Sequence, residues 1–245
     1  MCSHYQALKD QERFRKFFGI EPPADSYKTD LWPGYLGAFI KRHRHADAGD
    51  EAVPPNEALA GLFGLVPHWA KDTKITRHTY NARSETVAEK PSFRDAWRKG
   101  QRCIIPAEAF YEPDWRSGKA VATRIMRADG APMGIAGLWS WWKAPNGETT
   151  FSFTMLTINA ADHELMNRFH KPADEKRMVV VLPESAYGAW LDAPVEQQRE
   201  LLRPCAAELL AAQATELAPL SKMDHAVLGH ADPGTGGAVV SSLLP

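Results

Sequence analysis

The stretch RCIIPAEAFYEP (102–113) opens the part of the chain that decides the fold, because it begins a series of strand-like runs. Three more runs follow, namely AVATRIMRA (120–128), MGIAGLWSWW (133–142) and FSFTMLTIN (151–159). The turn sequences ADGAP (128–132) and APNGE (144–148) separate the last three, which is typical of antiparallel strands joined by hairpins. Since helices do not alternate strictly with these strands, we expect an α+β fold whose mostly antiparallel sheet forms a barrel-like core.

Short helices are predicted to decorate this sheet. The segment QALKDQERFRKFFG (6–19) places apolar residues at near-helical spacing and ends at a glycine. The segment PSFRDAWRKG (91–100) reads as a second helix with Ser92 as its N-cap, and AADHELMNRF (160–169) as a third with Asn159 as its cap. The pattern therefore favours helices packed around the strands over a doubly wound arrangement.

Additional strands are predicted on both sides of the central series. YLGAFIK (35–41) and LAGLFGLVP (59–67) read as a strand and its return strand around a polar loop. RMVVVL (177–182) reads as one buried strand, and residues 182–214 read mainly as short helices interrupted by prolines. These elements complete a strand-rich core with helical material concentrated toward the end of the chain.

Length and composition limit the class of protein. The 245 residues suit a single domain, predicted over residues 1–230, with a loosely held tail at 231–245. Lys and Arg number 29 against 30 Asp and Glu, so any nucleic acid must be bound in a local basic groove. Three cysteines without paired spacing predict no disulfide framework. No signal peptide and no membrane span are expected, which indicates a cytoplasmic location.

Cys2 stands directly behind the initiator methionine. Removal of Met1 would leave an amine and a thiol on adjacent carbons, a pair that condenses with an aldehyde to a five-membered thiazolidine ring. Covalent catalysis of this kind divides one difficult step into easier ones, and an α-amino pKa near 8 leaves a useful neutral fraction at pH 7. Taken alone, the cysteine is equally compatible with an incidental residue at this position.

Three further segments carry candidate chemistry. In TYNARSETV, the alternating Asn81, Arg83 and Glu85 would share one side of an extended segment, and an arginine suits a phosphate. Glu112 follows two aromatic residues, an environment that raises a carboxyl pKa and suits a general acid, with Glu108 as a rival. His170 precedes a buried strand and is a candidate acid or base. Each segment is also compatible with an ordinary surface role.

Other kinds of site are not indicated. No HExxH or paired CxxC spacing is present, so no metal site is expected. Neither GxGxxG nor GxxxxGK[ST] occurs, so no nucleotide cofactor is expected either.

In this order, the motifs resemble the SOS-response-associated peptidase family of abasic-site processing proteins. The resemblance covers residues 1 to about 192. It is carried by MC (1–2), WPG (32–34), FGLVPHW (63–69), NARSET (81–86), RCIIPAEAFYEP (102–113), TMLTINA (154–160) and FHKPADEKRMVVVL (169–182). It implies the fold of that family and a protein that binds single-stranded DNA at abasic sites, including single/double-strand junctions. It also implies removal of its own Met1 and a covalent crosslink to the ring-opened sugar aldehyde, which shields the lesion.

The resemblance assigns roles residue by residue. Cys2 matches the crosslinking nucleophile, and Asn81 matches the asparagine that positions the N-terminus. Arg83 matches the phosphate-contacting arginine. Glu112, rather than Glu108, matches the acid that helps to open the sugar. His170 matches the histidine that contacts the sugar hydroxyl, moves protons and can promote crosslink reversal.

The DNA-contacting positions are less uniform. Trp69 and Pro33 match residues that stack on or wedge against bases, and Thr157 falls on a strand near the site. Arg77 and Lys74 are candidate helpers at the phosphates. His4 stands where the family commonly has a phosphate-contacting arginine, so one backbone contact is expected to be weaker or dependent on pH.

Two further departures from the family pattern concern packing and a loop. Trp69 is followed by Ala70 where the family often has a second tryptophan, which would reduce one stacking surface. Residues 171–176 separate His170 from Arg177, a longer loop than is usual in the family.

Three other functions fit some of the same residues. An N-terminal-nucleophile amidohydrolase also uses a cysteine behind a removed methionine, although its layered sandwich needs long helices between sheets. A non-catalytic single-strand binder on the same fold is the second alternative, and an intracellular protease acting on other proteins is the third. For the family reading we expect a monomer without cofactor, associated with the nucleoid when it binds DNA.

Overall fold

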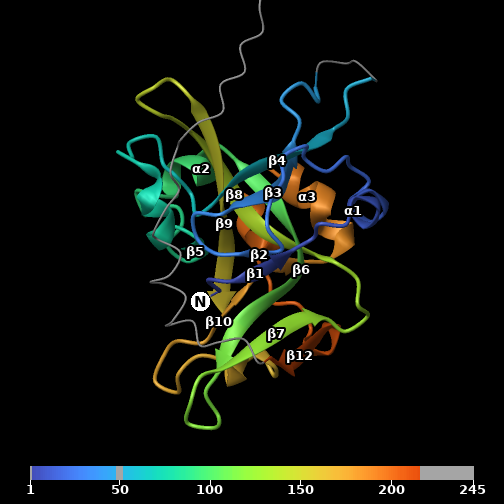
Figure 1. Ribbon diagram of the computed structural model, residues 1–245, viewed down its shortest axis with the longest axis vertical. Helices are drawn as coiled ribbons and strands as arrows, with labels where there is room; N and C mark the ends of the chain where they lie inside the picture. Colours follow the sequence, from blue (N-terminus) through green and yellow to red (C-terminus); the bar gives the residue numbers. More distant parts are fainter. Residues whose placement is uncertain (1, 48–51, 216–245) are drawn as a thin grey trace, which may run out of the picture.

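The computed structural model describes residues 2–47 and 52–215, and within these ranges one sheet organises the chain (Figure 1). Strands β6, β8 and β9 are the longest. They pair in a ring with β3 and β4, in the order β8–β9–β4–β3–β6 and back to β8, which closes a barrel. The first six strands are β1 (Tyr5–Ala7), β2 (Asp30–Leu31), β3 (Leu36–Arg42), β4 (Asn56–Phe63), β5 (Asn81–Arg83) and β6 (Arg102–Asp114). The others are β7 (Val121–Arg127), β8 (Met133–Lys143), β9 (Thr149–Asn159), β10 (Arg177–Val179), β11 (Val181–Leu182) and β12 (Leu210–Ala214).

The four predicted central strands are confirmed, but the hairpin expected at ADGAP (128–132) is wrong, because β7 pairs with β6 and β12 and not with β8. β6 pairs antiparallel with both β7 and β8, and β8 pairs antiparallel with β9. β3 and β4 form the predicted hairpin. The sheet is mixed, however, because β4 and β5 both run parallel to β9. The layered sandwich of an N-terminal-nucleophile amidohydrolase is therefore not the architecture of the described residues.

The helices are shorter than the sequence patterns predicted. They are α1 (Gln11–Phe18), α2 (Arg94–Arg98) and α3 (Tyr187–Asp192), with 3-10 turns η1 (Thr73–His78), η2 (Met166–Arg168), η3 (Glu184–Ala186), η4 (Gln198–Leu201) and η5 (Ala207–Leu209). None of the helices in the described ranges is long and apolar enough to cross a membrane.

The first helix begins later than the sequence pattern predicts. Asp10 is its N-cap, because the Asp10 carboxylate accepts the backbone N–H of Arg13 at 3.0 Å. Gly19 ends the helix in a left-handed conformation, as its sequence position indicated. The two residues at 6–7 belong instead to β1, since their backbone pairs with β6. Strand pairing with the barrel therefore outweighs the local helical spacing at the start of this segment.

Four other details differ from the predictions. Phe93, not Ser92, occupies the N-cap position of α2, and only one 3-10 turn forms within residues 160–169. The buried run 177–182 is two strands, because β10 pairs with β9 whereas β11 pairs with β8. Residues 210–214 form strand β12 on β7, which no local pattern indicated. The predicted boundary at residue 230 and the tail lie outside the described residues.

The pairing of β1 with β6 brings the start of the chain to the candidate catalytic glutamate. Tyr5 lies opposite Phe110, and the backbone N–H of Tyr111 donates to the carbonyl of His4 at 3.0 Å. Continued by the same antiparallel register, Ser3 and Cys2 run alongside Glu112. Strand pairing in the barrel therefore places the start of the chain next to residues that lie about a hundred positions later in the sequence.

Candidate functional site

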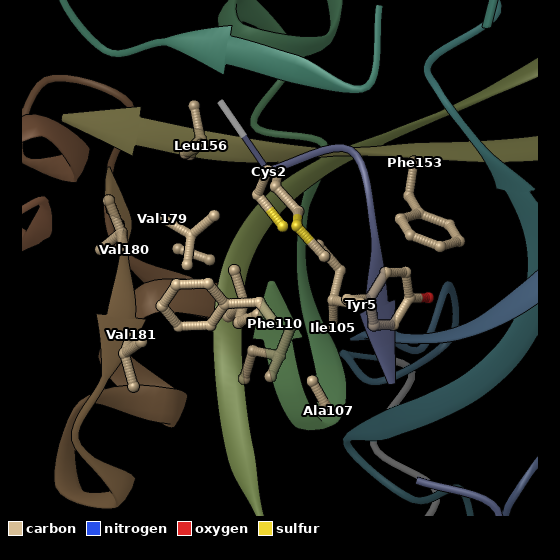
Figure 2. Close-up of a cluster of buried hydrophobic side chains, with 14 of the residues drawn as sticks. Cys2, Tyr5, Ile105, Ala107, Phe110, Phe153, Leu156, Val179, Val180 and Val181 are labelled. Atoms are coloured by element: carbon tan, nitrogen blue, oxygen red, sulfur yellow. The ribbon is translucent and has the colours of Figure 1, made fainter. Parts of the chain in front are cut away.

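Cys2 is buried at the end of the barrel core. Its side chain is 1 % exposed, and Figure 2 shows its sulfur among apolar side chains that include Ile105 and Phe110. The thiol donates to the carbonyl of His4 at 3.3 Å. The side-chain amide of Asn81 donates to the Cys2 carbonyl at 2.8 Å, so a strand far along the sequence holds this residue in place.

The environment of Cys2 keeps its thiol protonated. Burial raises the pKa of Cys2 to about 12, and the nearby Glu112 carboxylate adds to this rise. A thiol with such a pKa is a poor nucleophile at neutral pH, because the thiolate is the reactive form. Any covalent chemistry at this residue must therefore begin at another atom or must first change the charge around the sulfur.

Asn81 is delivered by β5, which lies parallel to β9 with Asn81 opposite Met155. Ala82 turns into the core, so Asn81 and Arg83 share the other side of the strand, as the alternation predicted. The amide oxygen of Asn81 is buried and has no hydrogen-bond partner among the described residues. It can accept a hydrogen bond from an amine or a hydroxyl that enters the site.

Glu112 lies near the end of β6 and is 2 % exposed. Burial raises its pKa above the ordinary value, and the neighbouring His170 acts in the opposite direction. The Glu112 Oε2 atom lies 3.4 Å from Nδ1 of His170. A buried carboxyl with a raised pKa keeps its proton above the usual carboxyl range and can release it to a group that needs one.

His170 adopts a left-handed backbone conformation with φ 65°, the only non-glycine residue to do so in the described ranges. Its backbone N–H donates to the carbonyl of Pro113 at 3.0 Å. Its Nε2 atom lies 3.0 Å from the carbonyl of Arg177, which can only accept. The neutral ring must therefore carry its proton on Nε2 and present the Nδ1 lone pair to Glu112.

Lys176 stabilises this unusual loop, a role that the sequence analysis did not identify. Its ammonium donates to three successive carbonyls, those of Phe169 at 3.0 Å, His170 at 3.3 Å and Lys171 at 2.7 Å. A left-handed non-glycine residue costs of order 1–3 kcal/mol and persists only where its surroundings enforce it. Although the loop is longer than the family pattern, His170 and Arg177 still meet directly in space.

Arg83 is exposed, but its guanidinium is paired with the Glu175 carboxylate at 2.7 Å. The other oxygen of Glu175 binds Arg177 at 2.6 Å, and Arg177 also binds Glu85 at 2.8 Å and the carbonyl of Thr157 at 2.8 Å. Arg177 and Arg83 hold the pKa of Glu175 below its ordinary value. The predicted strand face is thus only partly correct, because the strand ends at Arg83 and Glu85 turns to Arg177.

The predicted DNA-contacting residues lie on surface segments, and two of these segments touch each other. Pro33 is half-buried in the turn before Gly34, and an added side chain at Gly34 would touch Thr76 of η1. Arg77 in that same turn of 3-10 helix is exposed. Trp69 is 49 % exposed on the loop after β4. These placements are compatible with a surface for a strand of DNA but do not include a direct contact with Cys2.

Three other predicted candidates have structural partners. Glu108, the rival of Glu112, forms an ion pair with Arg13 at 2.8 Å, away from His170. His4 is 3 % exposed and enclosed, a different setting from the exposed phosphate contact expected for it. Thr157 is buried on β9, where its hydroxyl lies 3.3 Å from the guanidinium of Arg177. No cluster of three or more metal-ligating side chains occurs in the described part of the chain.

Sequence comparisons place the chain among known proteins. The model of the family described as SOS response associated peptidase (SRAP) matches residues 1–222. The chain is 38 % identical over 139 residues to the abasic site processing protein YoqW of Bacillus subtilis (strain 168), which covers 56 % of this chain and 58 % of the relative. It is 29 % identical over 180 residues to the abasic site processing protein HMCES of Xenopus tropicalis, covering 63 % and 52 % of the two chains. The match thus spans little more than half the length of these relatives.

Solved structures resemble the fold. A protein from Bordetella bronchiseptica has a TM-score of 0.79 and 51 % identity, with 88 % of this chain and 100 % of that chain covered. A protein from Bacteroides thetaiotaomicron has a TM-score of 0.72 at 21 % identity, over 87 % and 91 % of the two chains, and shows the fold alone. With the family match extending over most of its length, the chain belongs to the SOS response associated peptidase (SRAP) family.

Proposed function

We propose that this protein binds single-stranded DNA at abasic sites and traps the sugar aldehyde through the amine and thiol of Cys2. The observation that carries this proposal is the fixed position of Cys2, whose carbonyl is held by Asn81 while Glu112 lies nearby and contacts His170. The printed names of the relatives, abasic site processing proteins, supply the substrate class.

The first step is hydrolysis of the bond between Met1 and Cys2, which consumes one water and releases methionine. Met1 lies outside the described residues. This step therefore rests on the family description as a peptidase and on the need for a free α-amine at Cys2 in the later steps. Intact-mass measurement of the purified protein is expected to show the loss of Met1. Retention of the methionine would leave the amine blocked and would contradict the proposed chemistry.

The second step opens the abasic sugar. Protonated Glu112 donates to the ring oxygen, the bond from that oxygen to C1′ breaks, and the C1′ hydroxyl loses its proton to give the aldehyde. The Nδ1 lone pair of neutral His170 takes up the proton that the C1′ hydroxyl loses and passes it to the Glu112 carboxylate, which it faces. A raised carboxyl pKa suits this role, since only the protonated acid can donate.

The third step forms the ring. The Cys2 amine attacks C1′, the resulting hydroxyl takes a proton from Glu112 and leaves as water, and an iminium results. The thiol then gives its proton to the Glu112 carboxylate and adds to the same carbon, and the nitrogen keeps one hydrogen, so that aldehyde and aminothiol give thiazolidine and one water. The positive iminium offsets the environment that keeps the thiol protonated, so the sulfur becomes reactive after the amine has bound the substrate.

One gel tests the proposal. Protein is mixed with single-stranded DNA that carries one abasic site, with an intact strand of the same sequence as the control, and heated in denaturant. We expect a slower-migrating adduct with the abasic strand alone. Binding to both strands without any adduct would favour the non-catalytic single-strand binder, and adducts with neither strand and no binding would reject the DNA function.

Lys176 is expected to affect the rate through His170. Lys176→Met removes the ammonium from three carbonyls and keeps a side chain of similar length, so the left-handed loop relaxes. We expect crosslinking to slow about tenfold, equivalent to about 1.4 kcal/mol in the barrier. Lys171→Met is the matched control, because that ammonium lies over the ring of Trp115 instead. Equal rates for both variants would contradict the role of Lys176.

Arg83 is expected to exchange Glu175 for a DNA phosphate. Arg83→Ala should weaken binding to intact single strands and reduce the dependence of log K on log salt by about 0.7, the share of one single-strand phosphate. Glu175→Gln should tighten binding at low salt, because it removes the competing carboxylate. Arg15→Ala is the control, since Arg15 on α1 pairs with Glu21 at similar exposure and lies across the barrel from β5 (Figure 1). An unchanged salt slope for the Arg83 variant would contradict the phosphate contact.

We further propose that the substrate includes junctions between single- and double-stranded DNA, and that crosslink reversal and strand-cleaving lyase activity are further outcomes at the same site. A monomeric, cytoplasmic protein that meets the nucleoid when DNA is damaged fits this proposal. Sedimentation with and without DNA tests whether the protein is monomeric.

A further inference from the structure

His4 occupies the centre of a stack of three rings. Its imidazole lies 4.2 Å from the ring of Trp32 at an interplanar angle of 9°, and 4.0 Å from the ring of Tyr111 at 5°. Trp32 follows β2, and Tyr111 belongs to β6. The stack therefore joins the N-terminal arm to two separate segments of the barrel.

Polar contacts complete the hold on this residue. Nε2 of His4 lies 2.9 Å from a carboxylate oxygen of Asp30. The His4 carbonyl accepts two hydrogen bonds, one from the backbone N–H of Tyr111 at 3.0 Å and one from the thiol of Cys2 at 3.3 Å. The ring thus fixes the arm on one side, and the carbonyl of the same residue orients the sulfur on the other.

The position of the ring disagrees with a direct phosphate contact. His4 is 3 % exposed, and burial lowers its pKa while Asp30 acts in the opposite direction. The Nε2 atom of the ring already contacts the Asp30 carboxylate, so it is not free to bind a phosphate. A buried ring whose Nε2 atom already contacts a carboxylate is poorly placed to bind DNA. Both of its flat faces, however, stack on other rings.

We propose that His4 is a positioning residue, which clamps the N-terminal arm through the Trp32–His4–Tyr111 stack and so holds Cys2 in register with Asn81 and Glu112. The proposal rests on the proposed crosslinking function for its effect on rate, but the hold on Cys2 can be measured without DNA. What matters in this position is a flat ring, not a positive charge.

The rate of crosslinking tests the ring requirement. We expect His4→Ala to slow adduct formation on abasic single-stranded DNA about tenfold, and His4→Phe to restore most of the rate because it keeps the stack. His4→Lys should remain slow, and none of these variants should change the salt dependence of binding to intact strands. Rescue by lysine but not by phenylalanine, with a salt slope altered by about one phosphate, would overturn the proposal in favour of a backbone contact.

Alkylation of the cysteines in the absence of DNA gives a second test, in which the loss of the stack should raise a rate instead of lowering it. Iodoacetamide followed by peptide mass spectrometry reports Cys2, which the clamp keeps buried, and Cys103, which is 0 % exposed in the core. His4→Ala should accelerate alkylation of Cys2 severalfold while Cys103 stays protected, and His4→Phe should match the wild type. Unchanged alkylation of Cys2 in His4→Ala would overturn the proposal.

A second variant covers the case in which His4→Ala loses the whole fold, which rapid alkylation of Cys103 would reveal. Trp32→Leu removes one ring of the stack from outside the arm, and we expect the same pair of effects, faster alkylation of Cys2 and slower crosslinking. If Trp32→Leu leaves both rates unchanged, the stack does not position Cys2. If the wild type forms no adduct at all, the proposed function fails, whereas the alkylation series still decides whether His4 holds Cys2.

Discussion

Cys2→Ala is expected to abolish the heat-stable adduct with abasic single-stranded DNA. Alanine keeps the α-amine after loss of Met1 but has no sulfur to close the ring, so the reaction stops at the imine. Imines hydrolyse on heating, whereas a thiazolidine holds the carbon through two bonds. The measurement is a denaturing gel of heated samples, with intact mass to show that Met1 is absent from the variant.

Reduction with borohydride separates the roles of the amine and the sulfur of Cys2. Because the α-amine of the Cys2→Ala variant still forms an imine, borohydride should trap an adduct with this variant, and the adduct should be absent from DNA without the lesion. Cys205→Ala is the control for thiol loss, since Cys205 is partly exposed and lies apart from the site. A heat-stable adduct of Cys2→Ala, formed without reductant in wild-type yield, would reject ring closure by sulfur.

Glu112→Gln is expected to slow crosslinking by about 10²–10⁴-fold, the usual contribution of a general acid. The amide preserves the shape of the side chain but cannot deliver a proton to the sugar oxygen. Binding to intact single strands should be unaffected, because Glu112 is buried and is not a phosphate contact. Glu108→Gln serves as the control, since that carboxylate pairs with Arg13. If binding and crosslinking of Glu112→Gln fall together, the residue has a structural role instead.

The pH profile gives a second test of Glu112. Crosslinking should increase where rising pH deprotonates the α-amine, whose ordinary pKa is near 8, and should show a falling limb where rising pH ionises Glu112. Because burial raises the Glu112 pKa, the acid form persists above the usual carboxyl range, and the falling limb should vanish in Glu112→Gln. A profile that is identical in the two proteins would assign the proton to another group.

The raised pKa of Glu112 also predicts an effect on stability. The pKa of this carboxyl in the folded protein exceeds its unfolded value of 4.5. Its contribution to the free energy of unfolding is therefore fully present below pH 4.5 and is lost as pH rises through the folded pKa. Glu112→Gln removes that loss, so its Tm should exceed the wild-type Tm at pH 8 and approach it toward pH 4.5. A Tm difference that grows on acidification would contradict the direction of the shift.

The sequence by itself determined much of the scaffold. The turn sequence APNGE (144–148) led to the correct antiparallel pair of β8 and β9, because turn chemistry is local, whereas β7 pairs with β6 and β12 and not with β8 across ADGAP. Gly19 marked the end of α1 for the same reason. The motif around residues 81–83 placed Asn81 and Arg83 on one side of a strand, since alternation follows from the geometry of an extended chain.

Only the tertiary structure decided which residues act together. Nothing local indicates that Lys176 would enforce the backbone of His170, or that Glu175 would bind Arg83. The burial of Cys2, and with it the high pKa of the thiol, depends on barrel strands that lie far from it in sequence. Strand β12 likewise forms because β7 offers an open edge. Short-range patterns determine local conformation, whereas burial, pKa and charge pairing depend on neighbours that folding brings from distant parts of the chain.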